Sequence, residues 1–555
     1  MARLTLHENR IALHSRYEDR VIARQIAGRE WNPRHKVWLY PLRAETLNEL
    51  TVNFPGIDVS PKVSEAVLQV AMREQVVHNV KLAGWDNAKP AEDMPVKSKP
   101  FGHQIQGYNI GLQLPNVGIL MEQGCGKSLT AIAIMGRRYF RKEIKKAMIV
   151  APASVAPTWA KEEFGELAVH ANFPYEVLML QGPVNKRIKA LSEWEPDSSR
   201  LQIVVINYEA VWRMEETIAK WRPDMIICDE SQRIKTPSTR QSKSLHKLGK
   251  LAKYRLILTG TPVTQGPLDF FSQYKFLEPG IFGNSYTAFK ARYAVLGGPN
   301  RQIVVGYKNL PELVEKAHKI AFRVTKAEAL DLPEYVDQIR FCQLESFARG
   351  FYASLARDSV AELESGEKVT AANILVKLLK LQEATGGFVK EDGVNCISRA
   401  KINLLAEILG DVIEAGKKVV VFARFRAEIQ AIMKLLETMK IGHTVIYGDV
   451  PLNERGVRVN EFQQDPKCKV FVAQIQTAGL GITLTAADTA IFYSLDFSFA
   501  NYDQCRARIH RIGQKNACTY IHLIAEETID EKVMKVLKSK KSMADAVVDN
   551  WKELF

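Results

Sequence analysis

Residues 121–128 read Met-Glu-Gln-Gly-Cys-Gly-Lys-Ser and directly follow a short apolar run, Val-Gly-Ile-Leu. This order predicts a buried strand, a glycine-rich turn and the start of a helix. Gly124 and Gly126 let backbone N–H groups surround an anion, and Lys127 adds a positive charge. Ser128 can place its hydroxyl on Mg²⁺, while the dipole of the following helix favours the same anion. The segment therefore indicates a phosphate-binding loop within an α/β fold.

A second apolar run, residues 225–228, ends in two adjacent carboxylates, Asp229 and Glu230. A strand of this form can hold Mg²⁺ through water at Asp229, and Glu230 can polarise a water molecule for attack on a phosphate. An acidic helix cap after a core strand is the alternative interpretation of the pair.

Arginines are concentrated at residues 504–514, which read Gln-Cys-Arg-Ala-Arg-Ile-His-Arg-Ile-Gly-Gln. Arg508 and Arg511 are three residues apart, a spacing that predicts one face of a helix. Two arginines placed in this way could reach a γ-phosphate across a cleft and stabilise the charge that develops during phosphoryl transfer. A solvated basic helix is the alternative.

With the segments between them, these blocks resemble the Swi/Snf group of superfamily-two DNA-dependent ATPases over residues 101 to about 545. The rest of the resemblance is carried by residues 101–108, 148–159, 206–209, 258–262, 419–424 and 477–488. It implies ATP and Mg²⁺ as cofactors, DNA as the partner, and Gln104 as the residue that contacts the adenine base. It assigns catalysis to Lys127, Asp229, Glu230, Arg508 and Arg511, and Mg²⁺ binding to Ser128 and Asp229. It assigns nucleotide binding to Gln104, Gly124, Cys125, Gly126, Lys127, Ser128, Leu129 and Gly481.

Apolar strands alternate with periodic helices after residue 101, which predicts parallel sheets covered by helices. The expected fold is α/β, with two RecA-like parallel-sheet lobes and helical insertions, preceded by a small α+β module. Its expected parts are an N-terminal module (1–75), a linker (76–100), an ATP-binding lobe (101–325), a helical insertion (326–400) and a C-terminal lobe (401–555). The expected strands are 117–120, 147–151, 203–206, 225–228 and 255–259 in the first lobe, and 419–423, 444–447, 470–474, 489–494 and 519–524 in the second.

The N-terminal module is marked by residues 31–38, Trp-Asn-Pro-Arg-His-Lys-Val-Trp. Basic residues alternate with aromatic ones around this segment, which could give phosphate contacts and stacking surfaces. The residues are Arg20, Arg24, Arg29, Arg34 and Lys36 with Tyr17, Trp31, Trp38 and Tyr40. The segment resembles the HARP-type module of annealing helicases. Tryptophans that simply belong to a small core are the alternative.

The composition of the chain indicates which kinds of partner and compartment suit it. The net charge of +14 and a pI near 9.2 favour a polyanionic partner, although a basic protein with a solvated surface is the alternative. Seven cysteines without paired close spacing indicate a reducing compartment. No membrane segment is expected, because no 18-residue apolar stretch or signal core is present. We therefore expect a cytoplasmic, nucleoid-associated protein. The compact architecture, a motor with one small module, suits a bacterial or phage origin, and a phage-encoded protein would act in the host cytoplasm.

The expected function is an ATP-dependent DNA translocase that remodels branched DNA by strand annealing, fork regression or branch migration. Branched or duplex DNA would be bound through its phosphate backbone. A translocase that displaces proteins or a stalled polymerase is one alternative, and chromatin remodelling or an RNA helicase are others. A nucleic-acid-binding protein that does not hydrolyse ATP is a further one, suggested by Met121, Ser231 and Gln232 where the family more often has Gly, Ala and His. The sequence indicates no particular protein partner.

Overall fold

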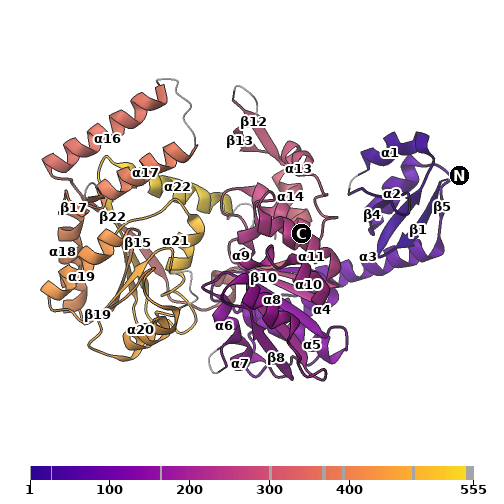
Figure 1. Cartoon of the computed structure of the whole chain (residues 1–555), viewed down its shortest axis with the longest axis horizontal. Coiled ribbons are helices and arrows are strands. Elements are labelled where there is room, and N and C mark those ends of the chain that lie inside the picture. The colour runs from indigo at the N-terminus through magenta and orange to yellow at the C-terminus, as the bar shows by residue number, and fades with distance from the viewer. Residues whose placement is uncertain are drawn as a thin grey trace. The chain divides into compact units, whose positions relative to one another are not determined.

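Figure 1 shows the computed structural model, in which the chain divides into two compact units, the first reaching Thr325 and the second spanning Lys326–Met543. The structure describes residues 2–26, 28–162, 165–298, 303–364, 371–390, 394–477 and 482–544. No helix within these residues is both long and apolar enough to span a bilayer.

The N-terminal module is a five-stranded sheet in the order β3-β4-β2-β1-β5, with helices on one face. Leu4, Ile11, Leu13 and Tyr40 point from alternate strand positions into a core that the helices cover. Its strands are β1 (Arg3–His7), β2 (Arg10–His14), β3 (Glu30–Asn32), β4 (Val37–Pro41) and β5 (Asp58–Val59). Its helices are η1 (Tyr17–Asp19), α1 (Arg20–Gln25), α2 (Ala44–Asn53) and α3 (Pro61–Leu82).

The tryptophan segment of this module, residues 31–38, is a hairpin. Trp31 on β3 lies opposite Trp38 on β4, with ring centroids 5.0 Å apart. The Asn32 side chain accepts hydrogen bonds from the backbone N–H groups of Arg34 (3.1 Å) and His35 (3.2 Å) in the turn. Trp38 packs against the core, whereas Trp31 is 46% exposed. Trp38 therefore contributes to the core of the module, whereas Trp31 lies largely outside it.

Helix α3 extends past the expected start of the linker at residue 76. Val63, Val67 and Val77 are buried along one of its faces, and the helix ends only at Leu82, ahead of Gly84 with φ of +68°. The expectation of a linker from residue 76 was wrong for this stretch, because residues 76–82 contain no proline or glycine and continue the buried face.

The first lobe contains a seven-stranded, all-parallel sheet in the order β14-β6-β11-β10-β7-β9-β8. All five expected strands are present. Strands β8 and β14 were not expected, because β8 is only half-buried at the sheet edge and β14 carries Arg323 within an apolar stretch. The strands are β6 (Asn116–Met121), β7 (Lys146–Ala151), β8 (Tyr175–Met179), β9 (Leu201–Asn207), β10 (Met225–Asp229), β11 (Tyr254–Leu258) and β14 (Ala321–Val324).

Helices surround this sheet, and α4, α5 and α12 contact its strands β6 or β11. A separate two-stranded hairpin, β12 (Ala294–Gly297) and β13 (Ile303–Tyr307), projects from the lobe (Figure 1). The helices up to the acidic pair are α4 (Gly102–Gln113), α5 (Lys127–Phe140), α6 (Ala156–Ala160), α7 (Glu166–His170), α8 (Val184–Ser192), α9 (Tyr208–Val211) and α10 (Glu215–Trp221). Those after it are η2 (Ser231–Ile234), α11 (Arg240–Leu251), η3 (Pro267–Asp269), α12 (Phe270–Leu277), α13 (Tyr286–Tyr293) and α14 (Leu310–His318).

The second unit has a six-stranded, all-parallel sheet in the order β15-β22-β21-β18-β20-β19. The five expected strands are present, and the sixth, β15, falls within residues 326–400. That range was expected to be a helical insertion, but β15 pairs with β22 over its whole length and so belongs to the sheet. The strands of this sheet are β15 (Tyr335–Cys342), β18 (Val419–Ala423), β19 (His443–Ile446), β20 (Val470–Gln474), β21 (Thr489–Phe492) and β22 (Cys518–Ala525). Strands β16 (Phe388–Lys390) and β17 (Val394–Cys396) pair with each other in a separate two-stranded sheet.

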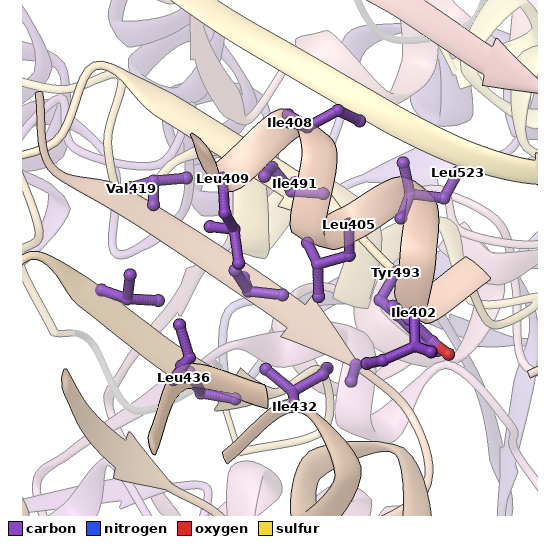
Figure 2. Packing of buried hydrophobic residues seen from close by; sticks show 14 of the residues in the cluster. Ile402, Leu405, Ile408, Leu409, Val419, Ile432, Leu436, Ile491, Tyr493 and Leu523 are labelled. Atoms are coloured by element: carbon purple, nitrogen blue, oxygen red, sulfur yellow. The ribbon is translucent and has the colours of Figure 1, made fainter. Parts of the chain in front are cut away.

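The core of this unit lies between the sheet and two helices, α18 and α19 (Figure 2). Leu405 and Leu409 of α18 and Ile432 of α19 are fully buried against strand residues such as Ile491. Burial of each such side chain contributes about 1.5–3 kcal/mol. The helices of the unit are α15 (Lys326–Ala329), α16 (Ser346–Glu364), α17 (Ala371–Thr385), α18 (Ala400–Glu414), α19 (Arg426–Thr438), α20 (Leu452–Gln464), α21 (Phe499–Arg506) and α22 (Ile529–Ala544).

Candidate nucleotide-binding site

The site forms at one edge of the first-lobe sheet. Strands β6, β11 and β10 are parallel neighbours, so the loops that follow Met121, Leu258 and Asp229 leave the sheet at the same edge. This arrangement brings the glycine-rich loop and the acidic pair together, as ligand sites in open α/β sheets require.

The glycine-rich loop adopts a backbone that only glycine accommodates. Gly124 and Gly126 have φ of +88° and +82°, and Lys127 is the first residue of α5. A Cβ atom on Gly126 would lie 2.0 Å from Nε2 of Gln104. Met121 ends β6 and is fully buried, with its main chain outside the left-handed region. A side chain at that position is therefore compatible with the loop.

Gln104 and His103 support the loop from behind. Gln104 Nε2 donates to the carbonyl of Cys125 (3.2 Å), and its Oε1 accepts from the Phe101 N–H (3.0 Å). His103 Nε2 also lies 2.8 Å from the Cys125 carbonyl, and burial lowers the pKa of this histidine. A neutral ring that donates from Nε2 fits both observations. Both the oxygen and the nitrogen of the Gln104 side-chain amide thus hydrogen-bond to main-chain groups. Contact with an adenine base would require these hydrogen bonds to break.

Lys127 is buried, and its ammonium group donates to two loop carbonyls, Met121 O at 3.1 Å and Glu122 O at 3.4 Å. These contacts hold the positive charge beneath the loop.

Asp229 lies at the end of β10 with only 7% of its surface exposed. Trp159 Nε1 donates to its Oδ2 at 2.9 Å, and the Tyr208 hydroxyl donates to its main-chain carbonyl at 2.7 Å. Burial raises the pKa of Asp229 and the adjacent Glu230 raises it further, while Trp159 and Lys127 oppose the rise. A bound cation would offset the burial and the charge of Glu230 and would thereby favour the ionised form of Asp229.

Glu230 is fixed by two glutamines. It has φ of +51°, and its carboxylate accepts from Gln123 Nε2 (3.0 Å) and from Gln232 Nε2 (2.8 Å). Gln232 Oε1 in turn accepts from the Thr259 hydroxyl at 2.8 Å, and that hydroxyl accepts from the Thr261 N–H at 3.0 Å. The acidic pair is thus hydrogen-bonded to the loop after β11.

Ser231 makes a second connection to the same loop. Its hydroxyl donates to Gln273 Oε1 at 2.7 Å, and Gln273 Nε2 donates to the Pro262 carbonyl at 2.8 Å. Ser231 and Gln232, two of the three positions that depart from the commoner family residues, therefore have defined structural roles here.

In the second unit, Arg508 and Arg511 lie beyond the helix on which they were expected. Helix α21 ends at Arg506, and the Arg508 carbonyl accepts instead from the Leu484 N–H at 2.9 Å. Arg511 Nη1 donates to the Ile482 carbonyl at 3.4 Å. The helix expectation was wrong because these bonds tie the arginine segment to the chain that precedes β21. Arg508 is 4% exposed, and the predicted nucleotide-binding Gly481 lies outside the described residues.

Comparison with known proteins decides the family. The SNF2-related domain model matches residues 70–386, and the helicase conserved C-terminal domain model matches residues 400–513. The chain belongs to the SNF2-related family. It thereby has both parts of a superfamily-two ATPase, as the sequence motifs predicted.

Relatives of this SNF2-related chain include an uncharacterized ATP-dependent helicase of Mycoplasma genitalium, 26% identical over 77% of the chain and 40% of the relative. The RAD54-like DNA repair and recombination protein of Drosophila ananassae is 25% identical over 77% of the chain and 59% of the relative. Among solved structures, the Sulfolobus solfataricus SWI2/SNF2 ATPase core in complex with dsDNA is 24% identical, with a TM-score of 0.40, over 84% of the chain and 97% of that structure. The chain thus spans 40–59% of the length of these two curated relatives.

The residues of the SNF2-related chain fit ATP and Mg²⁺. Gly124 and Gly126 provide the curved backbone for phosphates, and Leu129 lies in the first turn of α5, which points its N-terminal dipole at the loop. Ser128 and Asp229 would hold Mg²⁺, since the raised pKa of Asp229 marks a buried charge in need of a cation. When bound, the ion would neutralise phosphate charge during hydrolysis.

Three supporting residues were not singled out from the sequence. His103 and Trp159 contact the site from helices far from it in sequence, and Arg323 reaches it from β14. Arg323 donates to the carbonyls of Leu120 (3.1 Å) and Gly260 (3.0 Å). An arginine inside an apolar strand was the available signal for the last of these, because a buried guanidinium requires acceptors.

Proposed function

We propose that the chain is a DNA-dependent ATPase that moves along DNA and remodels branched DNA by strand annealing, fork regression or branch migration. The observation that carries this proposal is the common sheet edge at which Lys127, Asp229 and Glu230 meet in an SNF2-related chain. The names of relatives in DNA repair and recombination support a role in such processes.

In the proposed reaction, Lys127 exchanges its two carbonyl acceptors for oxygens of the terminal phosphates of ATP. Glu230, held by Gln123 and Gln232, orients the attacking water and polarises it. Arg508 and Arg511 of the second unit are the residues proposed to stabilise the charge on the γ-phosphate. The free energy of hydrolysis would drive movement along the DNA.

The N-terminal module offers a surface that suits unpaired DNA at a branch. The Arg20 guanidinium lies 3.9 Å from the ring centroid of Tyr17, and the Arg24 guanidinium lies 5.9 Å from that of Trp38. Arg20 and Arg24 are one helical turn apart on α1, and Trp38 contacts Trp31, so the five side chains form a continuous row. Tyr17 is 78% exposed, and exposed aromatic rings beside arginines can stack on bases next to a phosphate chain.

Displacement of proteins from DNA is the second candidate function, because it would use the same ATPase. The row on the N-terminal module favours the first candidate, since a protein-displacing translocase needs no contact to unpaired bases. A non-hydrolysing protein is disfavoured by the packing of Met121, Ser231 and Gln232 into the site without loss of the two carboxylates.

The test is the rate of ATP hydrolysis by the natural chain and by Lys127→Ala. The rate is measured without nucleic acid and then with duplex DNA, forked DNA, single-stranded DNA or RNA. Strong stimulation by DNA that is lost in the variant supports the DNA-driven ATPase. Higher stimulation by forks than by linear duplex, lost in a Tyr17→Ala/Trp31→Ala variant, supports branch remodelling. Stimulation by RNA alone, or no hydrolysis in any condition, contradicts the proposal.

A further inference from the structure

The hairpin β12–β13 stands apart from the seven-stranded sheet of the first lobe (Figure 1). Its two strands pair only with each other, with Ala294 opposite Tyr307 and an irregularity in register between Val295 and Leu296. A two-stranded hairpin is marginally stable unless its base is anchored. Its turn, residues 299–302, lies outside the described residues and is not part of the site considered below.

The strands of this hairpin present aliphatic side chains to solvent. Val295 is 42% exposed, Ile303 is 59% exposed and Val305 is 63% exposed. Exposed apolar side chains grouped on a projecting element, rather than scattered singly, mark interaction sites. We name this group, Val295, Ile303 and Val305, the aliphatic hairpin surface.

The base of the hairpin is held firmly. Arg292 Nη2 forms an ion pair with Glu312 Oε2 at 2.6 Å, and Asn309 Nδ2 donates to the Arg292 carbonyl at 2.9 Å. The Lys308 N–H donates to the Tyr293 carbonyl at 2.9 Å. Burial alone would raise the pKa of Glu312, but hydrogen bonds from Arg292 and Lys316 outweigh it and lower the pKa to about 2. The Glu312 carboxylate, which pairs with Arg292 at the hairpin base, is therefore ionised at physiological pH.

The hairpin also packs against the chain that follows β11, through Tyr307 and Gly266. A Cβ atom on Gly266 would lie 2.1 Å from the Tyr307 hydroxyl, so the tyrosine packs directly on that glycine. Gly266 follows the loop after β11, whose Pro262 carbonyl is bound by Gln273 and whose Thr259 is bound to Gln232. A continuous set of contacts thus leads from Glu230 to the base of the hairpin.

The charge of the surrounding sequence indicates the occupant. Within residues 279–298 and 303–311 the charged residues are Lys290, Arg292 and Lys308, all basic, and Arg292 is paired with Glu312 at the hairpin base. An exposed aliphatic surface in a predominantly basic setting suits a polyanion that also has apolar faces. DNA meets this description, because its bases are apolar on their faces and its backbone is anionic.

We propose that the aliphatic hairpin surface is a junction pin, which packs against the bases at the branch point of forked DNA and unstacks them there. The inference rests on the proposed action on branched DNA and assigns this contact to a site separate from the N-terminal module. Apolar side chains that wedge between bases unstack them, which is the chemistry this surface offers. ATP-dependent movement of the loop after β11 would reach the pin through Tyr307.

The test uses the full chain without ATP and forked DNA with 2-aminopurine, a base whose fluorescence rises on unstacking, at the branch point. The natural chain is expected to raise the fluorescence about three-fold or more, as wedging side chains unstack bases. Val295→Ser/Ile303→Ser/Val305→Ser is expected to abolish this rise while duplex-stimulated ATP hydrolysis stays within about two-fold, since backbone contacts dominate duplex affinity. Val305→Leu keeps the apolar surface and should retain the rise.

Val457→Ser is the matched control, because Val457 is 69% exposed on α20 of the second unit and lies outside the hairpin. A branch-point signal that persists in the triple variant, or no signal from the natural chain, overturns the pin. Concentration-dependent self-association that the triple variant loses also overturns it and makes a second copy the occupant. Absence of DNA-stimulated hydrolysis in the natural chain contradicts the proposed function instead, because the fluorescence measurement needs no ATP.

Discussion

Gln232 and Glu230 form a hydrogen-bonded pair in which the amide Nε2 donates to the carboxylate Oε2 at 2.8 Å. Because the same amide accepts from Thr259 through its oxygen, the loop after β11 controls the orientation of the carboxylate. The amide nitrogen of Gln232 must be the donor, because an ionised carboxylate can only accept hydrogen bonds. The pair therefore couples the position of the proposed catalytic carboxylate to the chain that leads towards the hairpin base.

Gln232→Ala removes this orientation and leaves Gln123 as the one remaining glutamine, among the described residues, that donates to Glu230. We expect kcat for ATP to fall by roughly 10- to 100-fold with little change in KM, because misplacement of a catalytic group affects the transition state more than substrate binding. Steady-state hydrolysis with duplex DNA measures both constants. Gln265→Ala, an exposed amide in the same lobe, is the control. An unchanged kcat in Gln232→Ala would show that the amide does not position Glu230.

Gly126→Ala adds a methyl group to a left-handed residue that already contacts Gln104. We expect ATP affinity to fall at least about 10-fold and the protein to lose about 1–3 kcal/mol of stability, because strain and steric conflict act together. Binding of a fluorescent ATP analogue and thermal unfolding measure the two effects.

The control for this change is Gly283→Ala, which has φ of +78° but no atom within 4 Å of the added carbon. It carries the strain without the steric conflict, so stability should fall by only about 1 kcal/mol and ATP affinity should not change. Equal loss of ATP affinity in both variants would contradict the role given to the Gly126–Gln104 contact.

The phosphate loop was predictable because every part of it depends on local chemistry. Two glycines permit the left-handed turn, and Lys127 follows at the start of the helix, so the short sequence carries the whole geometry. The acidic pair was predictable for a related reason, since an apolar strand that ends in carboxylates places them at a sheet edge. The strands with long apolar runs were predicted on the same basis.

What could not be predicted depends on contacts between distant segments. The spacing of Arg508 and Arg511 indicated a helix, but a bond to Leu484 ends the helix earlier. Trp159 contacts Asp229 across 70 positions of sequence, and no local pattern reports such a pair. Strand β15 was missed because most of its residues are exposed, so it lacks the apolar run of a central strand.

Mg²⁺ binding should depend on pH through Asp229, whose pKa is raised to about 7 by burial and by Glu230. Below this pH a proton occupies the carboxyl group and competes with the metal, so apparent Mg²⁺ affinity should fall as pH decreases from about 8 to about 6. Calorimetric titration with MgCl₂ in the absence of nucleotide measures this affinity. Asp229→Asn should remove the pH dependence together with most of the affinity, and a flat profile in the natural chain would contradict the assignment of Asp229 as a metal ligand.

The raised pKa of Asp229 also makes the free energy of unfolding depend on pH. Without metal, the folded state keeps a proton on Asp229 that the unfolded state releases near its ordinary pKa of 3.8. The free energy of unfolding should therefore decrease as pH rises between about 4 and about 7, and Asp229→Asn should be more stable than the natural chain at about pH 8. Added Mg²⁺ should stabilise the natural chain and leave Asp229→Asn unaffected. Thermal unfolding midpoints at several pH values, with and without MgCl₂, report both effects.

A buried ion pair holds the second unit together. Lys401 Nζ lies 2.5 Å from Asp530 Oδ2, with side chains that are 1% and 7% exposed. Asp530 also accepts from the Thr385 hydroxyl (3.0 Å) and from the Ala525 N–H (3.1 Å), so α17, α18, β22 and α22 meet at this point. Lys401→Met should destabilise the unit by about 3–5 kcal/mol, because it leaves a buried carboxylate without its cation.

The double change Lys401→Met/Asp530→Leu should recover much of that loss, since replacement of both charges by apolar groups removes the unpaired carboxylate. Lys189→Met is the control, because Lys189 forms an exposed pair with Glu193 in which both side chains are more than half exposed, at 73% and 65%. That change should cost less than about 0.5 kcal/mol. Residues 326–543 contain no tryptophan, so in urea denaturation tryptophan fluorescence follows the first unit and circular dichroism follows both. An equally small shift of the unfolding transition in Lys401→Met and Lys189→Met would show that the buried pair does not link these four elements. The apolar core around Leu405 and Ile432 would then hold the sheet to its helices by itself.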